Sequence, residues 1–432
     1  MELIEWILQD ENIDKAMKAV KKNKGAYGID KMSVEELDGY FAKHREEMKS
    51  QIREGKYKPT PVRRAYIPKS NGKRRPLGIP TVVDRVIQQA TAQVLSFGYD
   101  KYFSEHSYGF RPGRSCQQAI EEALVYLNEG YEWVIDLDIE KYFDTVNHDK
   151  LISILRERIN DAKTLRLIRK FLQAGVMENG LISPSKEGVP QGGPLSPILS
   201  NVYLDKLDKE LEGRGLCFVR YADDCNIFVK SEMAANRVMK SITSWLERKL
   251  MLKVNATKTK VVRPMKSNLL GFAFWKYKDG WKCKPAKDRK KRLYDKTRAI
   301  LCRRKAVARP MKSTFEQLNW LIRGWINYYR IGSMRMFLEE YGQWLRHKVR
   351  VVILKQWKKP KCIYSNLQKL NRIVGCNFTD EEIFKVANSR LGWYKRCGMY
   401  VVNFAISPKV LGRKTKSRPG LVDPLNYYLS NI

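Results

Sequence analysis

Two adjacent aspartates, Asp223 and Asp224, stand between two apolar runs in the stretch LCFVRYADDCNIFVK, residues 216–230. Successive side chains of a β-strand point to opposite faces, so a regular strand cannot present both carboxylates on one side. The runs CFVRY and CNIFV are typical of strands, and a tight hairpin turn between them would present Asp223 with Asp224 beside it. An ordinary polar turn, in which aspartate is common, is the alternative interpretation.

A second acidic stretch, VIDLDIEKYFD, favours the first interpretation. We predict a strand that ends near Asp138 and leads into a helix, and the period-2 alternation places Asp136, Asp138 and Glu140 nominally on one face. Carboxylates at a strand end that face a carboxylate pair on a hairpin suit Mg²⁺, with substrate phosphates as the other ligands. Two such ions, about 4 Å apart, would activate an attacking hydroxyl and stabilise a leaving pyrophosphate.

The charge of the chain predicts a polyanionic partner. Its 432 residues include 82 Lys and Arg against 46 Asp and Glu, a net charge of +36, and from Trp281 onward 35 basic residues face only 9 acidic ones. Nucleic acid is favoured over an acidic membrane surface, because no apolar run approaches the roughly 20 residues of a spanning helix. We therefore expect a soluble, cytoplasmic protein with no membrane partner.

The eight cysteines contain no C-x-x-C pair and the chain has four histidines. This pattern argues against both a disulfide framework and a zinc module, and free thiols are expected.

The chain is long enough for two or three domains, and its mixture of strands and helices predicts an α+β fold. Residues 1–55 are predicted to form helix, loop and helix. RRAYIPKSNGKRRPLGIP is predicted to form two short strands, followed by a helix over about 82–97. After residue 310 the pattern is helical, and in FEQLNWLIRGWINYYR it places Leu318, Leu321, Trp325 and Tyr328 near one face. The later segment MYVVNFAI is strand-like.

The chain resembles the reverse transcriptases, and most closely those encoded by group II introns, also called maturases. The resemblance covers residues 20–275 in ordered blocks, and IRGWINYY resembles the maturase or thumb region. The blocks that carry it are SYGFRPGRS, VIDLDIEKYFDTVNHD, VPQGGPLSPILSN, RYADD with its apolar flanks, LKVNATKTK and LLGFAFW.

The resemblance implies a right-hand polymerase followed by a basic helical domain. Its expected parts are an N-terminal extension and fingers (1–130, with 151–190 also in the fingers), a palm (131–280), a thumb or maturase domain (281–375) and a C-terminal basic DNA-binding region (376–432).

The implied function is RNA-directed DNA polymerisation, which extends a DNA primer on an RNA template with dNTPs. The protein would also bind group II intron RNA to promote splicing, and would bind target DNA for mobility. No nuclease of the H-N-H type is expected, because paired cysteines are absent and histidines are too few. The alternatives are a retron or diversity-generating reverse transcriptase, expected to lack a segment like IRGWINYY, and a splicing factor without polymerase activity.

The resemblance assigns the carboxylates. It makes Asp138, Asp223 and Asp224 the catalytic residues and the ligands of two Mg²⁺ ions. Asp138 is chosen over Asp136 because the family's bulky residue that excludes a ribose 2′-hydroxyl lies five positions after the catalytic aspartate, which selects Phe143. Asp136 is then expected to be a hydrogen-bonded structural acid, and a core aromatic remains the alternative for Phe143.

Other residues are expected to bind the nucleotide or template. The resemblance assigns contact with the incoming nucleotide to Gln191 and binding of the triphosphate to Lys69 and Arg75. It assigns binding of template or nucleotide to Arg111 and Arg114, for which a structural loop role is the alternative.

In VPQGGPLSP, paired glycines let the backbone approach a substrate closely, and Ser196 followed by Pro197 predicts a capped helix start. The alternative interpretation of this segment is a turn that only connects a strand to a helix and has no contact with substrate. The aromatic residues of the thumb helix, Trp320, Trp325, Tyr328 and Tyr329, are expected to pack in a core rather than stack on bases.

Overall fold

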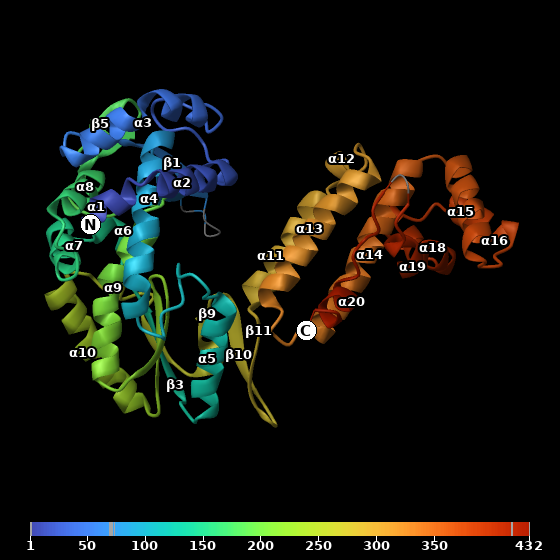
Figure 1. The fold of residues 1–432 in the computed structure, drawn as a ribbon. Helices are drawn as coiled ribbons and strands as arrows, with labels where there is room; N and C mark the ends of the chain where they lie inside the picture. Colours follow the sequence, from blue (N-terminus) through green and yellow to red (C-terminus); the bar gives the residue numbers. More distant parts are fainter. Residues whose placement is uncertain (1, 69–71, 73, 416–417, 432) are drawn as a thin grey trace. The chain divides into compact units, whose positions relative to one another are not determined.

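The computed structural model describes residues 2–68, 72, 74–415 and 418–431. The chain forms two compact units, which divide between Ser267 and Asn268. Figure 1 shows the fold and labels many of its elements. Lys69, expected in the triphosphate site, lies outside the described residues.

The N-terminal part of the first unit combines helices with a small sheet. The strand order is β2-β1-β4-β5, in which β1 runs antiparallel to β2 and parallel to β4. The expected helix-loop-helix and the two strands that follow it are present. The elements are α1 (Leu3–Ile7), α2 (Asp10–Asn23), α3 (Leu37–Arg53), β1 (Val62–Pro68), β2 (Arg74–Ile79), α4 (Val82–Tyr99), β4 (Val176–Glu178) and β5 (Leu181–Ser183).

The second sheet of this unit is antiparallel, with strand order β6-β7-β3-β8. Helix α10 packs on β3, β7 and β8, whereas α5 and α9 contact β6. The elements are α5 (Cys116–Asn128), β3 (Trp133–Asp138), α9 (Ser196–Gly213), β6 (Cys217–Tyr221), β7 (Asp224–Val229), α10 (Glu232–Leu250) and β8 (Lys260–Val262). The predicted hairpin and the strand that ends at Asp138 are confirmed.

Short helices complete the first unit: η1 (Asp100–Tyr102), α6 (Tyr142–Thr145), α7 (His148–Arg156), α8 (Ala162–Gln173) and η2 (Pro264–Lys266). One buried apolar cluster extends from Ile4 to Leu252, and it includes Ile135 of β3, Leu204 of α9 and Ile227 of β7. The helices and the antiparallel sheet therefore share a single core, and the α+β prediction is confirmed.

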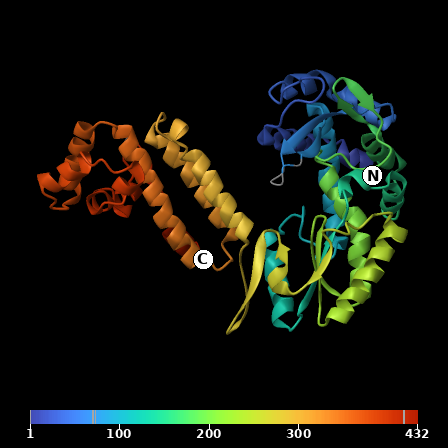
Figure 2. The ribbon, with the colours of Figure 1, turned by 180° about the vertical axis from the view of Figure 1, so that it is seen from behind.

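The second unit starts with a three-stranded sheet of order β11-β10-β9 and continues as helices. Helix α20 contacts both α13 and α14, an arrangement that can be followed in Figures 1 and 2. The elements are β9 (Asn268–Leu269), β10 (Phe272–Tyr277), β11 (Gly280–Pro285), α11 (Lys287–Ile300), α12 (Arg303–Ala306), α13 (Met311–Tyr329), α14 (Arg335–Trp357), α15 (Pro360–Val374), α16 (Asp380–Ala387), α17 (Trp393–Cys397), α18 (Tyr400–Ala405), α19 (Pro408–Gly412) and α20 (Pro424–Leu429).

Three expectations for this unit are wrong. Leu318 is buried on α13 as predicted, but the rest of the buried face is Ile322, Ile326 and Tyr329, one position later than predicted. Trp320 is 73% exposed rather than packed in a core. The strand-like segment MYVVNFAI contains helix α18, whose Val401, Val402 and Ala405 are buried. Helical spacing suits this segment because its apolar residues pack on neighbouring helices, including α15 and α16.

All eight cysteines are free. Within the part of the chain that the structure describes, no helix is long and apolar enough to span a membrane.

The shared core makes a stability prediction. Leu207→Ala removes a fully buried side chain of α9 and should lower the free energy of unfolding by about 2–5 kcal/mol, because lost transfer energy and a cavity add together. Leu181→Ala is the matched control, since Leu181 is 75% exposed and its loss should change stability by less than about 0.5 kcal/mol. Urea unfolding followed by tryptophan fluorescence measures both, and equal midpoint shifts would contradict the assignment of the core.

Candidate active site

Three carboxylates meet at one end of the antiparallel sheet. The register of β3 and β7 sets Asp138 directly opposite Asp224. Asp223 precedes Asp224 in the turn between β6 and β7, whose first residue, Ala222, has a positive φ of 59°. Hairpin loops of this length favour positive φ at the first central position, because their twist then matches that of the strands. The structure thus brings Asp138, Asp223 and Asp224 together.

Burial and like charge raise the pKa of the hairpin carboxyls. Desolvation is the main cause for Asp223, and the neighbouring charge of Asp138 adds to it, whereas the cations of Arg75 and Lys258 oppose it. Desolvation, followed by the charges of Asp223 and Asp138, raises the pKa of Asp224 to about 6. The mutual influence of these groups shows that they share one electrostatic environment.

Asp136 is a hydrogen-bonded structural acid, as expected. Its Oδ1 accepts hydrogen bonds from Asn226 Nδ2 at 2.6 Å and from Ser267 Oγ at 2.6 Å. Its Oδ2 lies 3.4 Å from Lys260 Nζ. These partners hold its carboxylate in place on β3, two residues before Asp138.

Arg220, one residue before the turn begins at Tyr221, is a central residue that the sequence analysis missed. It is fully buried and pairs with Asp208 of α9 through two hydrogen bonds, Nε to Oδ1 at 2.7 Å and Nη2 to Oδ2 at 2.5 Å. It also donates to the carbonyl of Ala222 at 2.8 Å and to Ser107 Oγ at 2.8 Å. A charged residue in an otherwise apolar strand was the signal that could have revealed it.

The loop that contains SYGFRPGRS packs against the same turn. A side chain at Gly109 would lie 2.3 Å from the backbone nitrogen of Ala222, so only glycine permits this approach. The carbonyl of Gly109 accepts a hydrogen bond from Asn201 Nδ2 at 2.8 Å. The turn that carries Asp223 is therefore held by α9 and by this loop.

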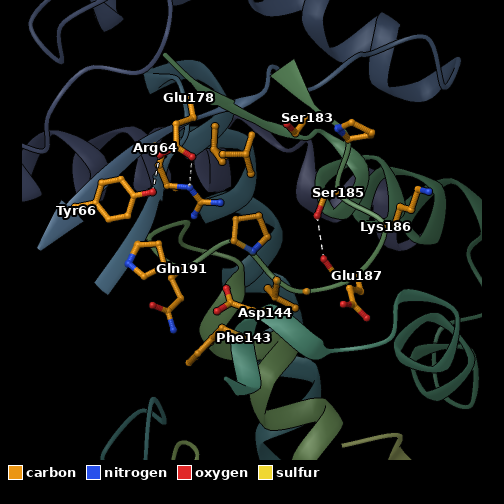
Figure 3. A pocket seen from close by; sticks show the side chains of 18 residues that line it. Arg64, Tyr66, Phe143, Asp144, Glu178, Ser183, Ser185, Lys186, Glu187 and Gln191 are labelled. Carbon is orange, nitrogen blue, oxygen red and sulfur yellow. Dashed lines mark hydrogen bonds and ion pairs between the residues drawn. The ribbon is translucent and has the colours of Figure 1, made fainter. Parts of the chain in front are cut away.

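A cavity of about 580 Å³ contains three of the predicted nucleotide-binding residues. Arg75, Phe143 and Gln191 line it, together with Phe110 and the Gly192–Gly193 segment. Phe143 and Gln191 also line a neighbouring cavity of about 510 Å³, shown in Figure 3 with Glu178 joined to Tyr66 and Arg64 on its rim. The main chain of Gln191 is fixed because its carbonyl accepts from Gly78 N at 2.7 Å.

The glycine pair packs closely against the protein, and the cap of α9 differs from expectation. A side chain at Gly192 would lie 2.8 Å from the carbonyl of Gly78, and one at Gly193 would lie 2.3 Å from Gln88 Oε1. The pair thus permits close packing inside the protein. Helix α9 is capped at Leu195, and Ser196 is its first residue, with the hydroxyl donating to Pro190 O at 2.6 Å. The helix begins at Ser196 as predicted, but the prediction that Ser196 is its N-cap is wrong, because Ser196 lies inside the first turn and the N-cap position makes no side-chain hydrogen bond.

The two loop arginines are occupied by contacts within the protein. Arg111, 3% exposed at its side chain, donates to Asp100 Oδ1 and to the carbonyls of Asp100, Ser104 and Ser107. Arg114 pairs with Glu105. The structural loop role accounts for the contacts of Arg111, which the structure does not place in the cavity with Arg75, Phe143 and Gln191.

The carboxylate group suits a hard divalent cation. Carboxylate oxygens are the ligands that Mg²⁺ prefers, and acids with raised pKa values gain from a bound cation. Among the residues that the structure describes, no group of three or more His, Cys, Asp or Glu side chains is placed to hold a metal ion. The described side chains are therefore not a complete ligand set by themselves.

Breaking the buried pair tests how the hairpin is held. Arg220→Met leaves the Asp208 carboxylate buried without its partner and should lower the free energy of unfolding by about 3–5 kcal/mol. Arg220→Met combined with Asp208→Leu should lose much less, because two apolar side chains then replace the pair. Chemical denaturation measures both variants. A double variant as unstable as the single one would contradict the assignment.

Two family models match this chain. Residues 67–274 match the reverse transcriptase (RNA-dependent DNA polymerase) model, and residues 290–371 match the group II intron, maturase-specific domain. The first match includes the three carboxylates and Arg75, Phe143 and Gln191, and the second extends from within α11 to within α15.

Curated relatives agree with these models. The chain is 35% identical to Protein YkfC of Escherichia coli (strain K12) over 299 residues, which cover 60% of this chain and 78% of YkfC. It is 38% identical to the group II intron-encoded protein LtrA of Lactococcus lactis subsp. cremoris over 208 residues, 48% of this chain but only 34% of LtrA. The putative COX1/OXI3 intron 2 protein of Saccharomyces cerevisiae is 35% identical over 228 residues, 52% of this chain and 26% of that protein.

Among solved structures, the partial Cas6-RT-Cas1--Cas2 complex matches at 28% identity and a TM-score of 0.37, covering 57% of this chain and 43% of that one. The chain belongs to the reverse transcriptases that carry a group II intron maturase domain, a family of RNA-directed DNA polymerases.

Proposed function

We propose that this protein is the reverse transcriptase and maturase of a group II intron, extending a DNA primer on an RNA template and binding the intron RNA to promote splicing and mobility. The observation that carries the polymerase part is the meeting of Asp138, Asp223 and Asp224 at one end of the antiparallel sheet. A carboxylate group in a basic protein is suited to hold cations against nucleic-acid phosphates.

In this proposal Asp138 and Asp223, with Asp224 beside them, hold two Mg²⁺ ions. When bound, the ions would activate the primer 3′-hydroxyl and stabilise the pyrophosphate leaving group. Arg75 lies close enough to lower the pKa of Asp223, and its cation is placed to neutralise triphosphate charge. Lys69 is proposed as its partner by family resemblance. Arg111 and Arg114 are proposed to stabilise their loop, and they would affect template or nucleotide binding only indirectly, through the position of that loop.

Phe143 and Gln191 are proposed to select the nucleotide. Both line the cavity that also contains Arg75, and Figure 3 shows them from the neighbouring cavity. Phe143 is only partly buried against the core, so one part of its ring is available to a ligand. An aromatic ring beneath C2′ leaves no room for a hydroxyl, which would favour dNTPs.

The basic second unit is proposed to bind RNA and DNA. Beyond Trp281 the chain has 35 basic residues against 9 acidic ones. Such charge density supports a long contact with phosphates, because each neutralised phosphate releases counterions. We assign fingers to about 1–130 and 151–190, palm to 131–280, intron RNA binding to a thumb or maturase domain over about 281–375, and target DNA to residues 376–432. The protein would act in the cytoplasm.

The carboxylate assignment can be tested by substitution. Asp223→Ala should reduce cDNA synthesis on a primed RNA by at least about 100-fold, because transition-state charge loses its stabilisation, while intron RNA binding stays nearly unchanged. Primer extension and filter binding measure the two effects. Glu132→Ala, which removes an exposed acid just before β3, is the matched control. Retained synthesis by Asp223→Ala would remove the metal assignment.

The steric assignment can be tested separately. Phe143→Ala should raise the ratio of ribonucleotide to deoxyribonucleotide incorporation by about tenfold or more, because the space beneath C2′ opens. Single-nucleotide extension with each nucleotide in turn measures this ratio. Phe97→Ala is the control, since Phe97 is 90% exposed on α4. Unchanged sugar selectivity in Phe143→Ala would count against the gate.

A further inference from the structure

Lys258 forms an ion pair with one of the three carboxylates. Its Nζ donates to Asp138 Oδ1 at 3.0 Å and to Oδ2 at 2.9 Å. The ammonium group thus contacts both oxygens that a divalent cation would use. Its positive charge also opposes the rise in the pKa of Asp223 and of Asp224, so it is close to the whole group.

The sheet and the turn before β8 place this lysine. Strands β3 and β8 are antiparallel, and their pairing ends with Asp136 opposite Lys260. Lys258 lies in the turn that leads into β8, and its side chain reaches Asp138 from there. Two acids of β3 therefore face two lysines from the β8 side, and opposite charges across a strand pair attract.

The turn before β8 is tied to the backbone of Asp138. Asp138 N donates to Thr259 Oγ1 at 3.1 Å, and Asn255 N donates to the carbonyl of Asp138 at 2.8 Å. The side chain of Asn255 closes this turn by accepting from Thr257 N at 3.2 Å and from Lys258 N at 3.3 Å. The backbone of Lys258 is thus fixed beside the carboxylate.

The side chain of Lys258 remains able to leave. It is 64% exposed, and in the described part of the chain Asp138 is its ion-pair partner. An exposed ion pair contributes little stability, so a better cation ligand for the carboxylate can displace it. Because the backbone is fixed and the ammonium group can be displaced, Lys258 is suited to bind the Asp138 carboxylate reversibly.

We propose that Lys258 is a tethered cation that occupies the Asp138 carboxylate of the free protein and competes with the divalent cation for it. This inference rests on the proposed function, in which Asp138 is a metal ligand. In the free protein the ammonium group relieves repulsion among the carboxylates and keeps divalent-cation affinity low. When a nucleotide contributes phosphate oxygens as further ligands, the divalent cation has enough ligands to displace the lysine.

The consequence is a coupling between cation binding and substrate binding. Each favours the other, because the substrate supplies the ligands that overcome the competition from Lys258. Such coupling is reciprocal by thermodynamic necessity.

The test measures Mn²⁺ binding by its electron paramagnetic resonance signal, with the full chain and without nucleic acid or nucleotide. Lys258→Met should bind Mn²⁺ about fivefold more tightly than the unaltered protein, the factor expected for loss of an exposed ion pair. Lys258→Arg should bind no more tightly than the unaltered protein, because a guanidinium can still pair with both oxygens. Lys260→Met is the matched control, since it removes an equal charge that pairs with Asp136 instead; its affinity should stay within about twofold.

Two outcomes would overturn the tethered cation: equal or weaker Mn²⁺ binding by Lys258→Met, or an equal gain in Lys260→Met, which would indicate a general charge effect. Asp138→Asn separates this inference from the proposed function. If Asp138→Asn weakens Mn²⁺ binding while Lys258→Met has no effect, the metal site stands and the competition fails. If Asp138→Asn leaves Mn²⁺ binding unchanged, the assignment of Asp138 as a ligand fails first.

Discussion

The antiparallel pairing of β3 with β7 in one register is the constraint on which the candidate site depends. It sets Asp138 opposite Asp224, although the two residues lie far apart in the chain. A slip by one residue would turn the side chains of a strand to the opposite face, and the carboxylates would separate. Strand β8 on the other edge of β3, and α10 packed on both, hold this register in place.

The position of the turn depends on a buried charge. Taking Arg220 and Asp208 out of water costs free energy, which their paired hydrogen bonds offset only if the geometry is good. The same guanidinium reaches the carbonyl of Ala222, inside the turn, and Ser107 in the adjacent loop. A structural ion pair therefore links helix α9, the hairpin and the loop, and a carboxylate group remains accessible at its edge.

Local patterns predicted the site better than they predicted its surroundings. The strands CFVRY and WVIDLD follow from short apolar runs rich in residues that favour strands, a signal that involves only neighbours in the sequence. The predictions for the buried face of α13, for Trp320 and for the segment at Tyr400–Ala405 were wrong. These features depend on which partner helices pack nearby. The hydroxyl of Ser196 likewise donates to the carbonyl of Pro190, a contact that local sequence patterns do not predict.

By itself, the sequence determined the hairpin with its paired aspartates, the strand that ends at Asp138 and the excess of positive charge, because each follows from residue type and short-range spacing. Only the tertiary structure decided that Arg220 is a buried partner of Asp208, that Arg111 is enclosed by its own loop and that Lys258 meets Asp138. These outcomes depend on contacts between distant segments, whose free energies arise only when the sheet and helices pack together.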